Sequence, residues 1–245
     1  MRKKKGQVTI FIIVLLFIIG IIIISFLFRD NLGLGNKNKV DNEVSMIDSA
    51  IENCVEQRTI DAVRMIGLQG GYIIPPENYL ETDLSNIAYG LYNGKKILIS
   101  EKEIEKEISN YLKLTLPFCI DENEFSEFNL SFSEPSASSK IKQESVVVKA
   151  RLPISASRDL ESFTINREYE TEVSIRLGEI YNIADEIVEK SIKEPEFIDI
   201  DYLVLLDYDV NFVSVDDNTL IYSITDLEYN IEGIPYSFVF GVDLG

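Results

Sequence analysis

Carboxylates are the most abundant side chains in this chain that could do chemistry. The 245 residues include 41 Asp and Glu, and two carboxyl groups flanking a substrate bond can catalyse its hydrolysis. Asp207, Asp209 and Asn211 have the alternating spacing that begins a calcium loop, but the Gly and the distant Glu of that loop are missing. We interpret these three residues as the solvated face of a strand, and residues 216–218 as a turn. No pair of carboxylates stands out, so the sequence assigns no catalytic residue, no metal ligand and no cofactor.

Nucleophilic catalysis has few candidates, because the chain contains no His. Without His, Ser-His-Asp and Cys-His mechanisms and most zinc or copper sites are excluded. Ser138, Ser139 and Lys140 are adjacent, yet a Ser-Lys hydrolase needs a packed Lys with a depressed pKa. Residues 131–140 are rich in Ser, so we predict a plain loop there.

Two cysteines, Cys54 and Cys119, are the next candidates. In an oxidising compartment their simplest arrangement is one disulfide bond, which on the chain-entropy model would stabilise the fold by roughly 4 kcal/mol. A pair of buried free thiols and a two-cysteine metal site are the alternatives. The metal site is the weaker of these, because the chain has neither His nor CxxC spacing.

Charge and one short motif describe the surface of the chain. The net charge is −18, and such an acidic chain repels phosphate backbones, which excludes nucleic-acid binding as its main function. Asn129 begins the sequence Asn-Leu-Ser, the pattern of an N-glycosylation acceptor. Asn129 is therefore a candidate glycosylation site. The alternative is that Asn129 is an unmodified residue of a strand.

Residues 8–28 form an apolar run without a charged side chain. At about 1.5 Å per residue, a helix of this length crosses a hydrocarbon core of roughly 30 Å, so we predict a transmembrane helix that contacts membrane lipid. The basic residues 2–5 place the N-terminus in the cytoplasm and the acidic remainder outside the plasma membrane. A cleaved secretory signal is the alternative, but its apolar core would be only about 7–15 residues long.

The junction between the basic stretch and the apolar run carries a resemblance to a known family. Residues 4–11 read KKGQVTIF, which resembles the class III signal of archaeal type IV pilin-like proteins. The resemblance implies that a membrane peptidase cuts between Gly6 and Gln7 and that the apolar helix stays on the mature protein. Pilins usually have Glu where this chain has Phe11, which argues against polymerisation into a filament. An uncleaved signal anchor is the alternative.

The elements that must position the outer residues begin with an amphipathic helix over residues 41–66, where apolar residues recur at helical spacing. Gly67, Gly70 and Gly71 follow this helix. A phosphate-binding loop belongs at a helix N-terminus, so we interpret these glycines as a helix stop. With the two cysteines, residues 67–72 also resemble uncharacterised membrane-anchored proteins of small-genome archaea, and this resemblance implies no activity.

Further elements follow from caps and alternating patterns. Ser100 and Glu103 predict a capping box for a helix over residues 101–113, and residues 178–193 predict one more amphipathic helix. Runs with alternating or β-branched residues predict strands. The last three of these strands are expected to form an antiparallel meander, joined by turns at 216–218 and 232–233. These strands are expected over 128–132, 145–152, 163–169, 171–177, 204–215, 219–228 and 236–242.

Helices first and strands later indicate an α+β fold. The predicted fold is an N-terminal transmembrane helix, amphipathic helices, and then an antiparallel β-sheet with one further helix packed on it. The expected domains are a cytoplasmic basic leader (1–7), the transmembrane helix (8–28), a linker (29–40) and an extracytoplasmic domain (41–245). The last of these is expected to divide into a helical part (41–120) and a sheet part (121–245).

The predicted function is that of a non-enzymatic surface protein, anchored in the membrane and pilin-like at its N-terminus. Its acidic domain would contact protein partners on the cell surface, or further copies of itself, as an adhesion or assembly accessory module. The alternative is an anchored extracytoplasmic hydrolase that works with carboxylates. An enzyme would have a concave pocket with convergent, pKa-perturbed carboxylates, whereas a binding module would expose an apolar or Tyr-lined patch.

Overall fold

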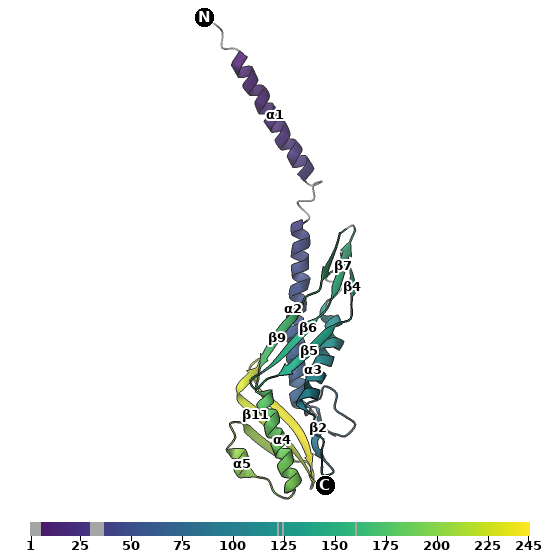
Figure 1. Ribbon diagram of the computed structural model, residues 1–245, viewed down its shortest axis with the longest axis vertical. Helices are drawn as coiled ribbons and strands as arrows, with labels where there is room; N and C mark the ends of the chain where they lie inside the picture. Colours follow the sequence, from purple (N-terminus) through teal and green to yellow (C-terminus); the bar gives the residue numbers. More distant parts are fainter. Residues whose placement is uncertain (1–5, 30–36, 122, 124, 160) are drawn as a thin grey trace. The chain divides into compact units, whose positions relative to one another are not determined.

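The computed structural model describes residues 6–29, 37–121, 123, 125–159 and 161–245 (Figure 1). The chain divides into two compact units, residues 1–49 and residues 50–245. Most of the predicted leader (residues 1–5) and most of the predicted linker (residues 30–36) lie outside the described residues. Gly6 and Gln7 are the first two residues of helix α1, and cleavage between them stays a prediction.

Helix α1 (Gly6–Arg29) is built from apolar residues. Its side chains are described from residue 13 to residue 24, and nearly all of them are exposed. Within the described part of the chain, none of the helices has both the length and the hydropathy that crossing a membrane requires. The transmembrane helix predicted over residues 8–28, and the fold class that included it, are therefore wrong.

Helix α2 (Lys37–Leu68) extends the helix predicted over residues 41–66 at both ends. From Ala50 onward it belongs to the second unit, where its apolar side chains are buried at helical spacing. Gly70 and Gly71 follow with φ angles of +67° and +96°, and the Gly71 amide donates to the carbonyl of Ile66 at 2.8 Å. This is the helix stop that the glycines predicted, because only Gly adopts such angles without strain.

The second unit contains a six-stranded sheet in the order β1-β2-β12-β11-β10, with β3 also paired to β2. Its last three strands form the predicted antiparallel meander, and the turn before β12 has positive φ at Glu232 and Gly233. Strand β2 pairs with β12 in parallel, however, so the expectation of a purely antiparallel sheet is wrong. The strands are β1 (Tyr79–Glu81), β2 (Asn86–Tyr92), β3 (Lys95–Lys96), β10 (Asp209–Ser214), β11 (Thr219–Ile231) and β12 (Ile234–Asp243).

Two antiparallel three-stranded sheets occupy the middle of the sequence, in the orders β4-β7-β8 and β5-β6-β9. The loop predicted over residues 131–140 is wrong except at residues 133–135, because strand β4 extends to Phe132 and strand β5 begins at Ser136 and pairs with β6. The strands are β4 (Asn129–Phe132), β5 (Ser136–Ile141), β6 (Ser145–Arg151), β7 (Ile154–Arg158), β8 (Glu161–Ile165) and β9 (Tyr169–Ser174).

The remaining helices pack on these sheets. Helix α3 (Glu101–Thr115) begins with the predicted capping box of Ser100 and Glu103, contacts β5, and continues into the 3₁₀ helix η1 (Leu116–Cys119). Helix α4 (Leu177–Lys193) contacts β2 and β12, and a short helix α5 (Ile200–Val204) precedes β10. Phe238 and Phe240 on β12 are fully buried and lie in the core of this unit.

Candidate functional site

Cys54 and Cys119 form a disulfide bond, as the sequence predicted, with their Cα atoms 5.6 Å apart. The bond joins α2 to η1, and its two half-buried cysteines lie 65 residues apart in the sequence. Among the described residues there is no free cysteine, so both alternatives, free thiols and a two-cysteine metal site, are wrong.

The Ser-Lys candidates are engaged in structural contacts. The Ser139 hydroxyl donates to the carbonyl of Glu105 and lies 3.1 Å from the hydroxyl of Ser109. Lys140 is exposed, and its ammonium group lies 2.9 Å from the Glu105 carboxylate, which raises the pKa of Lys140. A raised pKa keeps this Lys protonated, the opposite of what a general base requires.

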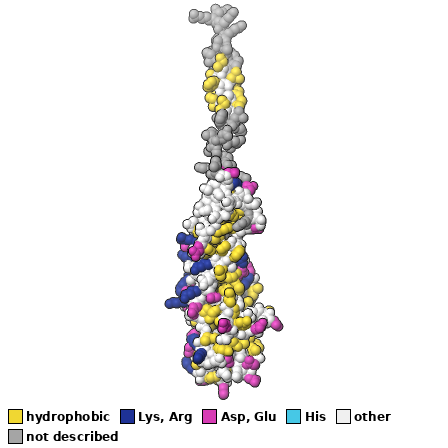
Figure 2. All heavy atoms as spheres, turned by 90° about the vertical axis from the view of Figure 1, so that its right-hand side faces the viewer, with side chains coloured by type: hydrophobic (Ala, Val, Ile, Leu, Met, Phe, Trp, Pro, Cys, Tyr) yellow, Lys and Arg dark blue, Asp and Glu magenta, His cyan; other side chains and the backbone are white. Residues whose placement is uncertain are grey.

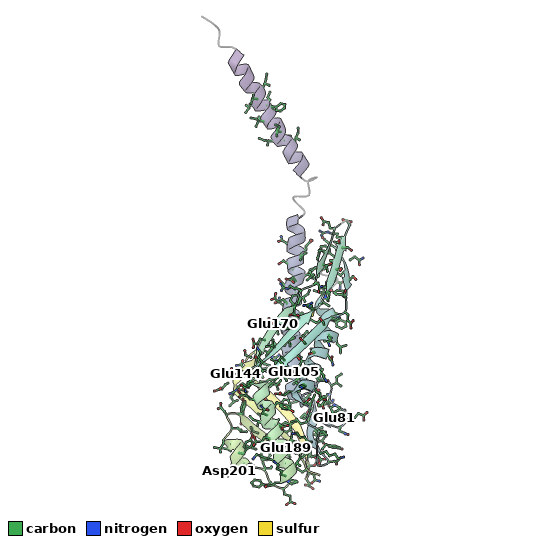
Figure 3. All side chains as sticks on the ribbon, in the orientation of Figure 1. Glu81, Glu105, Glu144, Glu170, Glu189 and Asp201 are labelled. Atoms are coloured by element: carbon green, nitrogen blue, oxygen red, sulfur yellow. A yellow bond between two sulfur atoms is a disulfide. The ribbon has the colours of Figure 1, made fainter. Side chains whose placement is uncertain are left out.

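The carboxylates are distributed over many elements. The six acidic residues labelled in Figure 3 come from separate strands, helices and turns and do not converge on one point. On the face drawn in Figure 2, Asp and Glu side chains are scattered among basic and apolar ones. Within the described ranges, no group of three His, Cys, Asp or Glu side chains is arranged to hold a metal ion.

One hollow of about 320 Å³ is lined by charged residues of α4 and the segment after it. Hydrogen bonds from Lys96 and Lys190 lower the pKa of two lining carboxyls, Glu189 and Asp199 respectively. A catalytic acid needs a pKa raised toward neutrality, so these carboxylates are suited to ion pairing and not to proton donation.

The residues that resembled a calcium loop have separate roles. Asp209 and Asn211 lie on β10 with exposed side chains, as predicted, whereas Asp207 precedes the strand and lies 3.5 Å from Arg176. In the predicted turn, the Asp216 carboxylate accepts hydrogen bonds from the amides of Asn218 and Thr219 at 2.9 and 2.8 Å. These backbone hydrogen bonds lower the pKa of Asp216.

Asn129 is the first residue of β4, and both it and Ser131 are exposed. An oligosaccharyltransferase needs access to both residues of the acceptor pattern. Glycosylation of Asn129 stays a prediction.

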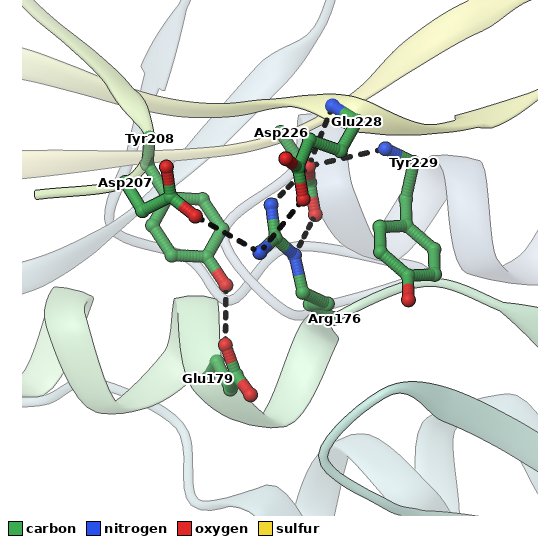
Figure 4. A network of polar contacts seen from close by, with 7 residues as sticks. All are labelled: Arg176, Glu179, Asp207, Tyr208, Asp226, Glu228 and Tyr229. Atoms are coloured by element: carbon green, nitrogen blue, oxygen red, sulfur yellow. Dashed lines mark hydrogen bonds and ion pairs between the residues drawn. The ribbon is translucent and has the colours of Figure 1, made fainter.

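A buried polar cluster surrounds Arg176 in the second unit (Figure 4). Arg176 is the residue before α4, and its guanidinium donates two 2.6 Å hydrogen bonds to the carboxylate of Asp226 on β11. Asp226 is fully buried, and its carboxylate also accepts the amides of Glu228 and Tyr229 at 3.0 and 3.1 Å. This bonding coincides with the irregular register between β11 and β12 that begins at Asp226.

Aromatic rings complete the cluster. The guanidinium carbon of Arg176 lies 4.5 Å from the ring centre of Tyr208 and 5.1 Å from that of Tyr229, which are cation–π distances. The Tyr208 hydroxyl donates to Glu179 at 2.7 Å, and burial together with this bond raises the pKa of Tyr208. The cluster therefore fixes the segment that leads into β10 to the start of α4.

The electrostatics of the buried pair are those of a permanent ion pair. The hydrogen bonds to Asp226 raise the pKa of Arg176. Burial alone would raise the pKa of Asp226, but the hydrogen bonds from Arg176 and the two backbone amides outweigh it and lower that pKa. Both groups remain charged near neutral pH, so the pair positions structure and exchanges no proton.

Strand β10 presents an exposed edge beside this cluster. Among the described residues it pairs only with β11, through six consecutive positions without a bulge. Helix α5 contacts β10, and large apolar side chains on these elements or directly after them are exposed, from 37% for Phe212 to 86% for Leu205. We name this the edge surface; its apolar members are Val204, Leu205, Phe212, Val213 and Val215.

Comparison with known protein families, with characterised proteins and with solved structures gives no match. The resemblance of residues 4–11 to class III signals therefore stays a prediction. What the chain does has to be inferred from its own side chains.

Sequence reasoning missed both the Arg176 cluster and the edge surface. No local pattern marks Arg176, because its partner Asp226 lies 50 residues away. The edge surface did leave a signal: residues 205–218 contain no Lys, Arg or Pro, the residues with which sheet edges are usually protected.

Proposed function

We propose that this chain is a non-enzymatic interaction module that acts outside the cytoplasm and contacts a protein partner through the edge surface. The observation that carries the proposal is the run of exposed apolar side chains along α5 and β10. Clustered apolar exposure of this kind is typical of protein–protein contact sites.

Two further observations support this function. The Cys54–Cys119 disulfide is typical of proteins in oxidising compartments. The Arg176 cluster holds the segment before β10 in place, and a rigid edge loses less entropy on binding than a mobile one. An adhesion or assembly accessory module, the role predicted from the sequence, would use such a surface.

Site-specific photo-crosslinking in the cells that produce the protein tests the proposal. The full chain carries p-benzoylphenylalanine in place of Val213 or, as the control, in place of Leu84. Leu84 is also exposed and apolar, at 97%, but lies between β1 and β2. We expect one discrete adduct of defined mass from position 213 and none from position 84. Equal labelling at both positions, or no adduct from 213, would contradict the proposal.

A further inference from the structure

The chemistry of β10 indicates which kind of partner the edge surface fits. The backbone groups on the outer side of β10 meet no other strand within the described ranges. Such a row of unpaired N–H and C=O groups is a template for one more strand.

The opposite edge of the same sheet is protected in ways that β10 is not. Strand β1 has only three residues, and the two-residue β3 consists of Lys95 and Lys96. Short edge strands and edge lysines are standard means of preventing unwanted strand pairing. Strand β10 has six residues, a regular register and none of these features.

The residues along the edge carry a surplus of negative charge. Residues 205–218 include four Asp and no Lys or Arg, and Arg176 lies 3.5 Å from one of these, Asp207. One pair of carboxylates, Asp207 and Asp209, lies at the start of β10, and the other, Asp216 and Asp217, lies just beyond its end. Opposite charges across a strand pair stabilise it and like charges destabilise it, so the complementary strand carries basic residues near both of its ends.

A second copy of this chain does not meet that requirement. Antiparallel pairing of two β10 strands, centred between residues 211 and 212, places Asp207 of one copy opposite Asp216 of the other. The chain also has a net charge of −18, so the two copies repel each other as they approach.

We infer that the edge surface receives an extended segment of a partner protein, apolar in its middle and basic at both ends, as an additional antiparallel strand on β10. This inference rests on the proposed function and specifies its partner. The main-chain hydrogen bonds supply affinity. The exposed side chains of Phe212 and Val213, on opposite faces of β10, contact alternate side chains of the incoming segment.

A synthetic peptide tests the inference on the full, disulfide-intact chain. The probe has the sequence Lys-Lys-Thr-Val-Thr-Val-Thr-Lys-Lys, and hydrogen exchange of residues 205–215 is followed by mass spectrometry. At a peptide concentration about ten times its Kd, we expect these amides to exchange about tenfold more slowly. Two control peptides should give no protection: one N-methylated at alternate residues, and one with Glu in place of each Lys.

A matched pair of variants keeps the test independent of folding. Val213→Lys places a positive charge on the edge and should abolish the protection by the peptide. Val239→Lys alters β12, which lies in the same sheet away from the edge, and should leave this protection unchanged. Circular dichroism melting shows whether each variant folds. Protection that survives Val213→Lys in a folded protein, or protection by the N-methylated peptide, would overturn the inference.

The remaining outcomes separate the inference from the proposed function. If position 213 gives an adduct in cells but the peptide does not slow hydrogen exchange, the inference of a basic extended segment would be overturned. The proposed function as an interaction module would remain. Concentration-dependent dimers that disappear in Val213→Lys would show that the occupant is a second copy, which also overturns the inference. Absence of the adduct and of the protection would overturn both.

Discussion

Replacing Arg176 by Met tests whether the buried ion pair holds the second unit together. The substitution keeps an unbranched side chain and leaves the Asp226 carboxylate buried without its two 2.6 Å partners. Breaking a buried pair by removing one member costs about 3–5 kcal/mol. The lower end applies, because the Asp226 carboxylate retains the amides of Glu228 and Tyr229. We expect a loss of about 3 kcal/mol, or about 6–12 °C in Tm for a domain of this size.

Urea unfolding of the disulfide-intact protein at several pH values measures this loss. Arg176 and the backbone amides hold the pKa of Asp226 below its ordinary value of about 3.9. The stability from this lowered pKa is fully present above about pH 4 and disappears as the pH falls through the folded-state pKa. The difference between the wild type and Arg176→Met should therefore be largest near neutral pH and shrink in acid.

The control is Arg151→Met, the same substitution at an exposed pair in which Arg151 lies 3.3 Å from Glu168. Exposed pairs contribute about 1 kcal/mol or less. If Arg176→Met destabilised the protein no more than Arg151→Met, or if its effect were independent of pH, the buried pair would not have the role assigned to it.

Four further variants test other parts of the fold. Replacing Cys54 and Cys119 by Ala should lower the free energy of unfolding by about 4 kcal/mol, and reductant should destabilise the wild type but not this variant. Ser100→Ala removes the helix cap and should cost about 1 kcal/mol, with unchanged urea dependence; no measurable loss would contradict the capping role. Gly71→Ala should cost about 3 kcal/mol or more, because φ is +96° and the added Cβ would lie 2.3 Å from Ile99. Gly94→Ala, with φ of +67° and open space around it, should cost only about 1 kcal/mol in the same urea unfolding assay.

The parts of the fold that could be predicted from the sequence are those set by neighbouring residues. The Ser100 cap, the stop at Gly71 and the turn at Glu232 and Gly233 all depend on contacts within a few positions. The pairing of β2 with β12 joins segments about 150 residues apart, as in Gly241 opposite Tyr89. No local periodicity encodes such a partner, which is why the parallel pair was missed.

Polar residues were misjudged where distant groups satisfy them. The Ser-rich segment after Ser136 forms a strand because β6 pairs with it and the Glu105 carbonyl accepts the hydroxyl of Ser139. Arg176 would be expected on the surface, since charged residues are rarely buried without a partner. Its burial depends on Asp226, and a single sequence does not indicate which of many acidic residues will fill that role.

The disulfide determines how the second unit would respond to a pulling force. A load applied at the two ends of the chain enters the closed loop at Cys54 and leaves it at Cys119, so the covalent bond carries the tension. The 65-residue span between them, which includes β1, β2, β3, all of α3 and most of η1, is shielded from stretching. At roughly 3.4 Å per extended residue this keeps about 220 Å of chain from being drawn out. The bond therefore limits how far the chain extends under load, although residues 120–245 lie outside the loop and can still be drawn out, and in a reducing environment the same load would draw out the 65-residue span as well.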